Sequence, residues 1–327
     1  MTPRASLPRL AAAAAFVLVL LVAIPLAITA SHRTDLYYTL SSVALLSIAS
    51  AGVWLTFYIG RINIGQGAYA LVGGYVSAIL VTTYGLSFWL SLPLAGLFCA
   101  LVSAVIGLPI LRLRGVYFAM VTLVLTEVAR LSALALGITN GAKGITNIPP
   151  PGPISLFGLT LVPSFDSFAE RNLAFYILSV VMMILCFAAL YRLVNSRIGQ
   201  LFAAMRQNEE LASSMGVNVP ALRVLAYAIS SFFGGVGGAI FAAIAQSVYP
   251  SSFTVNDSVN FMLNCFLGGL GYVFGPMLGT LVLYFGWDLL FQTGQYQLLI
   301  YSGVMIILML ALPNGLMSLR GPARRER

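Results

Sequence analysis

The run LAFYILSVVMMILCFAALY (173–191) is followed after four residues by SRIGQLFAAMRQNEELASSMGV (196–217). The first stretch has no charged residue and is about as long as a membrane-crossing helix, which needs about 20 mostly apolar residues. The second carries two arginines and two adjacent glutamates. An apolar run of bilayer length next to a polar helix predicts a membrane protein that holds one long segment in water.

The composition extends this prediction to the whole chain. Of 327 residues, 60% are hydrophobic and only 8% are charged, whereas a soluble domain has about 25% charged residues. The net charge of +8 does not indicate a nucleic-acid partner, because the basic residues are spread between apolar runs as membrane topology places them. We therefore expect lipid and protein partners and no nucleic acid.

Residues that could perform chemistry are few. The single histidine cannot build a His-based metal site or a Ser/His/Asp triad, and all three cysteines fall within apolar runs. Buried small hydrophobic residues are the expected role of such cysteines, since a disulfide framework or a zinc site needs spaced, exposed groups. The sequence predicts no metal site, no bound cofactor and no enzyme activity.

Hydrophobic segments predict an all-α polytopic fold with about ten transmembrane helices in one domain, 1–327. Glycines interrupt the third, eighth and ninth segments, so a broken or re-entrant pair is the alternative to two spans over 259–291. The ten segments are 10–30, 36–57, 64–83, 88–111, 116–136, 173–191, 224–245, 259–273, 274–291 and 297–312.

The distribution of basic residues predicts the orientation. With a cytosolic N-terminus, thirteen of the 17 basic residues lie inside and three outside, as the positive-inside rule requires. Both termini are then cytosolic. The first segment is interpreted as an uncleaved anchor, because its apolar run exceeds the 7–15 residues of a signal peptide; cleavage would leave the later segments in the same orientation.

The longest external segment, 137–172, is rich in proline and glycine. Proline stiffens the chain and removes amide donors, so we expect a packed extracytoplasmic loop. It could serve as a docking surface or as a simple connector.

The polar stretch lies in the predicted cytosolic loop 192–223 and has the pattern of one amphipathic helix. Gly216 stands where a helix ends in a left-handed conformation. Such a helix can lie on lipid, but interfacial helices usually carry lysine and arginine on the polar face; adjacent carboxylates favour a protein partner. The apolar stripe is Ile198, Leu201, Phe202, Met205, Ala212 and Met215; the polar face is Arg206, Gln207, Glu209, Glu210, Ser213 and Ser214.

Several polar residues fall inside apolar segments and are candidates for a translocation path. Glu127 has Arg130 one turn later; both should face protein or water, either as a structural pair, which we favour, or as part of a gate. Asn63 and Gln66 stand among glycines, where irregular backbone indicates either a path or close helix packing. Asn260 and Asn264 share one predicted helix face and could bond a substrate or a neighbouring helix.

Six stretches together resemble the LivM-type permeases of branched-chain amino acid importers over about residues 62–320. The polar stretch supplies EELASSMG (209–216), similar to the cytoplasmic loop of ABC importer permeases in its acidic residue, alanine and glycine, with one alanine fewer than the fullest pattern. The other five are INIGQGAYALVGGY (62–75), RGVYFAMVTLVLTEV (114–128), TNGAKGITNIP (139–149), GGLGYVFGPMLGT (268–280) and LPNGLMSLR (312–320). Residues 1–61 contribute only N-terminal spans.

This resemblance implies a permease subunit in a bacterial inner membrane, with the polar stretch as the coupling helix of an ATPase partner. Glu210, Ala212 and Gly216 match the loop pattern, and the polar-face residues Arg206 and Glu209 complete the predicted coupling set. The chain has no GxxxxGK[ST] phosphate loop, so ATP and Mg would be used by the partner. A second homologous permease, two ATPase subunits and an external substrate-binding protein are the implied partners.

Two kinds of alternative remain open at this stage. Importers for urea, amides or aromatic acids resemble the same family, so the substrate is not fixed by the resemblance. An ion-coupled secondary transporter with Glu127 as a proton site is the alternative of another class, and ATP dependence separates the two. A membrane enzyme would need a cluster of His, Cys and carboxylate groups that the sequence lacks.

Overall fold

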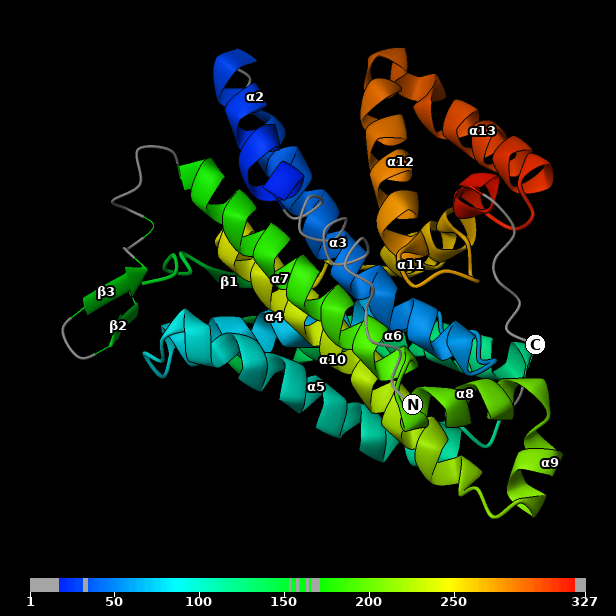
Figure 1. Cartoon of the computed structure of the whole chain (residues 1–327). Helices are drawn as coiled ribbons and strands as arrows, with labels where there is room; N and C mark the ends of the chain where they lie inside the picture. The colour runs from blue at the N-terminus through cyan, green and yellow to red at the C-terminus, as the bar shows by residue number, and fades with distance from the viewer. Residues whose placement is uncertain are drawn as a thin grey trace.

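The computed structural model describes residues 18–31, 35–113, 115–152, 154–156, 159–162, 165 and 171–320. These residues are almost entirely helical (Figure 1), which confirms the predicted all-α polytopic fold. The helices are α2 Ile24–Ser31, α3 Asp35–Tyr58, α4 Gln66–Thr82, α5 Phe88–Ile110, α6 Val116–Ala135, α7 Arg171–Val194, α8 Arg197–Gln207, α9 Glu209–Ser214, α10 Val219–Ala245, α11 Val255–Gly268, α12 Gly275–Leu289 and α13 Gln297–Ala311.

Helix length separates the elements into two groups. Within the described residues, six stretches are long and apolar enough to cross a membrane: α3, α5, α6, α7, α10 and the region Gly294–Ser318 that contains α13. The helices α4, α11 and α12 have 17, 14 and 15 residues, or about 21–26 Å at 1.5 Å per residue, against a hydrocarbon core of about 30 Å. They are the three segments that glycines interrupt.

Part of the sequence prediction lies outside the described residues. This concerns positions 10–17 of the first segment, His32, Arg33 and Arg114, and the arginines after Arg320. The described part of the first segment is a π-helical turn, Val19–Ala23, followed by α2.

Helix α10 lies at the centre of the bundle, packed against α3, α4 and α5 (Figure 1). Glycines permit its contact with α4. A Cβ atom on Gly73 would overlap the backbone of Gly235, and one on Gly238 would overlap the carbonyl of Ala70. Small residues bring helix backbones together in this way where lipid supplies no hydrophobic drive for association.

The segment after α10 returns to the bundle as a short hairpin. Helices α11 and α12 run antiparallel, because Gly268 lies against Gly275 and Gly279 against the carbonyl of Asn264. The turn between them is bound to α3, where Trp54 Nε1 donates to the carbonyl of Leu270 at 3.0 Å. Neither helix is long enough to be a full span, so the hairpin corresponds to the broken alternative for 259–291.

The two ends of the bundle carry different structures. At one end, strand β1 (Ile145–Thr146) pairs antiparallel with β4 (Ser247–Val248), and β2 (Ile154–Leu156) pairs with β3 (Leu159–Val162). The described part of the proline-rich segment contacts α5, where Trp89 Nε1 donates to the carbonyl of Gly152 at 2.8 Å. Helices α8 and α9 lie at the opposite end (Figure 1).

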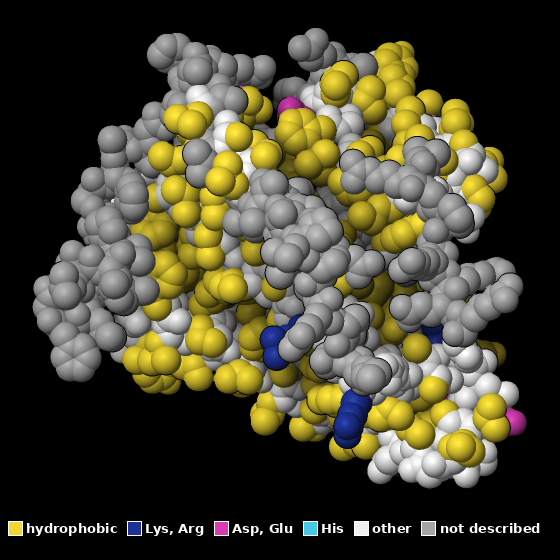
Figure 2. All heavy atoms as spheres, in the orientation of Figure 1, with side chains coloured by type: hydrophobic (Ala, Val, Ile, Leu, Met, Phe, Trp, Pro, Cys, Tyr) yellow, Lys and Arg dark blue, Asp and Glu magenta, His cyan; other side chains and the backbone are white. Residues whose placement is uncertain are grey.

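The surface is mainly apolar, as a bilayer requires. Among the residues coloured in Figure 2, hydrophobic side chains cover most of the visible surface, and the basic side chains seen there lie in the lower half, towards α8 and α9. The cytosolic position of that end stays a prediction of the positive-inside rule.

The α4–α10 contact predicts a specific sensitivity to added volume. Gly73→Ala should lower stability by about 1–3 kcal/mol, the usual cost of overpacking, because the new methyl group meets backbone that cannot rotate away. Gly303→Ala in α13, where nothing lies within 4 Å of the added carbon, is the matched control. The melting temperature of each purified variant in detergent is the measurement; an unchanged Gly73→Ala variant would contradict the packing.

The opposite placement of α9 and β2 predicts the sidedness of the chain. Single cysteines at Ser213 in α9 and at Ser155 in β2, with the three native cysteines replaced, should label from opposite sides of sealed cells. A membrane-impermeant thiol reagent should react with position 155 and not with position 213. Labelling of both positions from outside would reverse the arginine-based orientation.

Candidate functional site

The loop between α7 and α10 contains two helices where the sequence predicted one, and this prediction was wrong at Asn208. That residue has extended backbone angles (φ −155°, ψ 107°) and its Oδ1 accepts from the amide of Leu211 at 3.0 Å. Ser196 caps α8 in the same manner, accepting from Gly199 N at 3.4 Å. Asparagine is a strong N-cap residue because its side chain replaces a missing amide partner, so Asn208 starts a new helix.

The predicted end of the loop is confirmed. Gly216 has φ +85°, in the left-handed region, and follows directly after the residues that close α9. Its amide donates to the carbonyl of Ser213 at 3.0 Å. Nothing lies within 4 Å of the position a Cβ would take, so backbone conformation alone favours glycine here.

The end of α8 at Asn208 divides the predicted apolar stripe between α8 and α9. Of the predicted stripe, Phe202, Met205 and Ala212 are buried, whereas Ile198 and Leu201 are exposed. Met215 is 79% exposed, and Leu211 is 61% exposed. Two large apolar side chains therefore stand on the exposed side of α9, which is unfavourable in water unless another surface covers them.

The predicted polar face is partly exposed and partly turned inward. Arg206 and Glu210 are exposed, and Gly60 at the end of α3 packs beside the Arg206 stem. An open groove of about 480 Å³ runs along α9 to the start of α10. Its lining residues are Glu209, Glu210, Ser213, Ser214, Val219, Pro220 and Arg223.

Glu209 is the inward member of the carboxylate pair. Its Oε2 lies 3.8 Å from Nη2 of Arg61, and its Oε1 pairs with Nη2 of Arg223 in α10. The side chains of both arginines are nearly enclosed, at 6% and 11% exposure. Sequence reasoning missed both arginines, because residues so far apart in the chain leave no local pattern that pairs them.

Asn63 and Gln66 lie at the start of α4, inside the bundle. Both are fully buried. Asn63 Oδ1 accepts from the amide of Gly65 at 2.9 Å, and Gln66 Nε2 donates to the carbonyl of Ser230 at 2.9 Å. In this conformation the two predicted path residues are bound to the protein itself.

Helix α4 begins deeper inside the bundle than α6 does. The amide of Ile64 donates to Thr122 Oγ1 at 3.1 Å, and Thr122 lies six residues into α6, which is about 9 Å along the axis. Gly67 N donates to Ser258 Oγ at 2.9 Å, near the start of α11. Two shortened helices thus begin side by side within the bundle, and side chains take the backbone bonds that water cannot supply there.

Asn260 and Asn264 do not act as a pair, although the sequence placed them on one face. Asn264 is 5% exposed and its Nδ2 donates to Ser50 Oγ in α3 at 3.0 Å. Asn260 is exposed. Asn264 therefore joins α11 to α3, and only Asn260 is accessible in this conformation.

Glu127 and Arg130 form the predicted intrahelical pair. Arg130 Nε donates to Glu127 Oε2 at 2.9 Å and Nη2 donates to Oε1 at 2.5 Å. The side chains are 41% and 30% exposed on the outside of α6. A charged pair at this depth is expected to face protein or water, and the described part of the chain does not enclose it.

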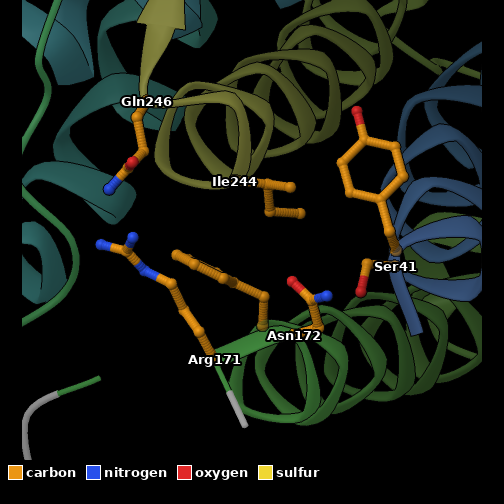
Figure 3. Close-up of a pocket in the computed structure, with 7 residues that line it drawn as sticks. Ser41, Arg171, Asn172, Ile244 and Gln246 are labelled. Carbon is orange, nitrogen blue, oxygen red and sulfur yellow. The ribbon is translucent and has the colours of Figure 1, made fainter. Parts of the chain in front are cut away.

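A cavity of about 270 Å³ opens at the other end, between α3, α7 and the end of α10. In Figure 3 the Arg171 guanidinium and the Gln246 carboxamide lie on one side, with Asn172 and Ser41 towards the other. Sequence reasoning did not find it, because the lining comes from three distant helices. Among the described residues, no group of three His, Cys, Asp or Glu side chains could hold a metal ion.

Comparison with known proteins places this arrangement in a family. A family described as "Branched-chain amino acid transport system / permease component" matches residues 36–313. The chain belongs to this family. The match begins before residue 62 and so includes α3, which extends the region indicated by the sequence resemblance.

Individual relatives of this permease family agree with the match. The LivM high-affinity branched-chain amino acid permease protein of Salmonella typhimurium is 33% identical over 279 residues, or 80% of this chain and 65% of the relative. LivM of Escherichia coli is 32% identical over the same shares. The nucleoside ABC transporter permease protein NupC of Lactococcus lactis is 27% identical, over 68% of this chain and 71% of that protein. No solved structure matches.

The chain thus aligns with a little under two thirds of the length of the LivM relatives. The part of this chain that matches the family, residues 36–313, contains α8, α9 and the starts of α4 and α11.

The Glu127–Arg130 pair predicts an epistatic effect on folding. Glu127→Gln should reduce the amount and melting temperature of the purified protein, because it leaves the Arg130 guanidinium without its carboxylate at membrane depth. Adding Arg130→Gln should restore part of the loss, since two neutral amides remain. If Glu127→Gln folds normally but abolishes uptake, and Arg130→Gln gives no rescue, the residue belongs to the transport mechanism instead.

Proposed function

We propose that this chain is the permease subunit of a bacterial inner-membrane ABC importer for branched-chain and similar hydrophobic amino acids. Separate ATPase subunits would bind ATP and Mg on the cytosolic side. A second, homologous permease and an external binding protein would complete the importer. Family membership and the long apolar helices support the membrane role.

The loop α8–α9 carries the proposal for ATPase coupling. It is a rigid, doubly capped pair of helices that exposes Glu210, Leu211 and Met215 beside a groove. A carboxylate next to apolar side chains suits a cleft in a protein better than an anionic lipid surface, which attracts basic residues. Ala212 and Gly216 lie towards the end of the loop, whereas Arg206 is in the last turn of α8 and Glu209 is the first residue of α9.

The proposed substrate class is supported by the two LivM relatives, whose printed descriptions name branched-chain amino acids. The NupC relative is described as a nucleoside permease protein, so the helical scaffold alone does not choose the substrate. We propose that the external binding protein makes most of that choice. Both termini are proposed to be cytosolic.

Transport assays test the function directly. Membrane vesicles containing the chain with its co-purifying partners should accumulate labelled leucine when ATP is supplied, and a protonophore should not prevent this. Competition with isoleucine, valine, urea, an amide, phenylalanine and a nucleoside identifies the substrate class. Uptake that needs an ion gradient and no ATP would favour a secondary transporter and overturn the proposal.

The coupling surface predicts a separable defect. Glu210→Arg reverses the exposed charge of α9, and Gly216→Arg disfavours the left-handed end of the loop. Each should lower the amount of ATPase that co-purifies by about tenfold, equal to about 1.4 kcal/mol of binding free energy, and abolish uptake while the chain still inserts. Lys143→Glu, at the other end of the molecule, is the control. Full assembly and transport in both variants would refute the assignment.

A further inference from the structure

Glu209 connects the cytosolic loop to three parts of the transmembrane bundle. It pairs with Arg223, in the second turn of α10, and with Arg61, which follows α3 directly after the Gly60 turn. Arg61 Nη1 also donates to the carbonyl of Leu113, in the turn between α5 and α6, at 2.7 Å. One carboxylate and two nearly enclosed guanidinium groups thus join α9, α10, the end of α3 and the α5–α6 turn.

Arg61 is also the first residue of the segment that leads into α4. Residues 61–65 are not helical and run from the end of α3 to the buried start of α4. Only Ile62 separates Arg61 from Asn63, whose side chain accepts from Gly65 N. An extended residue spans at most about 3.6 Å, so there is little slack between the Arg61 backbone and the first turn of α4.

The start of α4 is hydrogen-bonded to three other helices. Ile64 N is bound to Thr122 of α6, Gln66 to the carbonyl of Ser230 in α10, and Gly67 N to Ser258 of α11. Ser258 Oγ also lies 3.0 Å from Thr126 Oγ1 in α6. A displacement of residues 61–65 therefore acts at the point where α4, α6, α10 and α11 meet within the membrane.

Glu209 lies between two cations, and it is the carboxylate through which α9 pairs with both of them. Loss of its charge would remove the attraction that draws both guanidinium groups to α9. The neighbouring Glu210 is exposed and makes no such connection. The adjacent carboxylates thus have different positions: Glu210 faces outward from α9 and Glu209 faces the bundle.

We propose that Glu209 is a positioning residue that transmits movement of α9, through Arg61 and residues 61–65, to the junction of the shortened helices α4 and α11. The proposal rests on the proposed function, since it assumes an ATPase acting on α9. Ion pairs and packed elements with two discrete arrangements are the physical means by which such coupling travels.

The test measures leucine uptake and ATP hydrolysis in the same reconstituted importer. Glu209→Gln and Arg61→Gln should still assemble with the ATPase and hydrolyse ATP, but the leucine transported per ATP should fall about tenfold or more. The conservative changes Glu209→Asp and Arg61→Lys should recover most of this ratio. Arg112→Gln, the same change at an exposed position in the α5–α6 turn, is the matched control and should leave the ratio unchanged.

A second readout reports the movement itself and does not require uptake. Ile62 is 37% exposed, and the three native cysteines are buried, so a thiol reagent should report on an I62C variant selectively. Its labelling rate should differ at least threefold, by our expectation, between nucleotide-free and vanadate-trapped importer, and Glu209→Gln should remove the difference.

The outcomes are distinct. If Glu209→Gln and Arg61→Gln lower only the yield of protein and leave transport per ATP unchanged, the cluster is purely structural and the proposal is wrong. The same conclusion follows if the I62C response survives Glu209→Gln. A wild-type importer without ATP-driven leucine uptake would instead refute the proposed function.

Discussion

The contact between the backbones of α4 and α10 is the constraint on which the rest of the structure depends. It requires glycine at positions 73 and 238, because any side chain there would overlap the facing backbone. In lipid, helices gain little from burying apolar side chains against one another, so close packing of small residues is the main attractive force available. With α10 held centrally, α3 and α5 pack around it.

This close packing also explains how helices can begin inside the membrane. An N-terminus there leaves amides that water cannot satisfy, and each must find a partner in the protein. At the start of α4 the partners are Asn63, Thr122 and Ser258. Polar residues that the sequence suggested as part of a translocation path thus form hydrogen bonds with irregular backbone. Rearrangement of this junction would break several of these hydrogen bonds together.

The α8–α9 loop and this junction are connected by the ion pair of Glu209 with Arg61. Arg61 lies between them, bound to Glu209 on one side and leading to Asn63 on the other. Because its guanidinium is also bound to the Leu113 carbonyl, the segment is held at several points and is unlike a flexible linker. Anchoring of this kind is what the proposed connection between an ATPase and the membrane junction would need.

The amino-acid sequence by itself determined the fold class and most of the helix limits. Helices α3, α5 and α6 end within one residue of their predicted segments, as for 88–111 against Phe88–Ile110, because the cost of placing polar groups in lipid acts locally on each segment. Helix α10 begins five residues before its predicted segment and α7 ends three residues after it. The sequence also determined the left-handed end at Gly216 and the Glu127–Arg130 pair, since both depend on residues within one helical turn.

Only the tertiary structure decided which polar residues are buried and which groups they contact. It divided the loop at Asn208, turned Glu209 inward to Arg61 and Arg223, and separated Asn264 from Asn260. These outcomes depend on distances between helices remote in the chain, and hydrophobic periodicity contains no information about such distances.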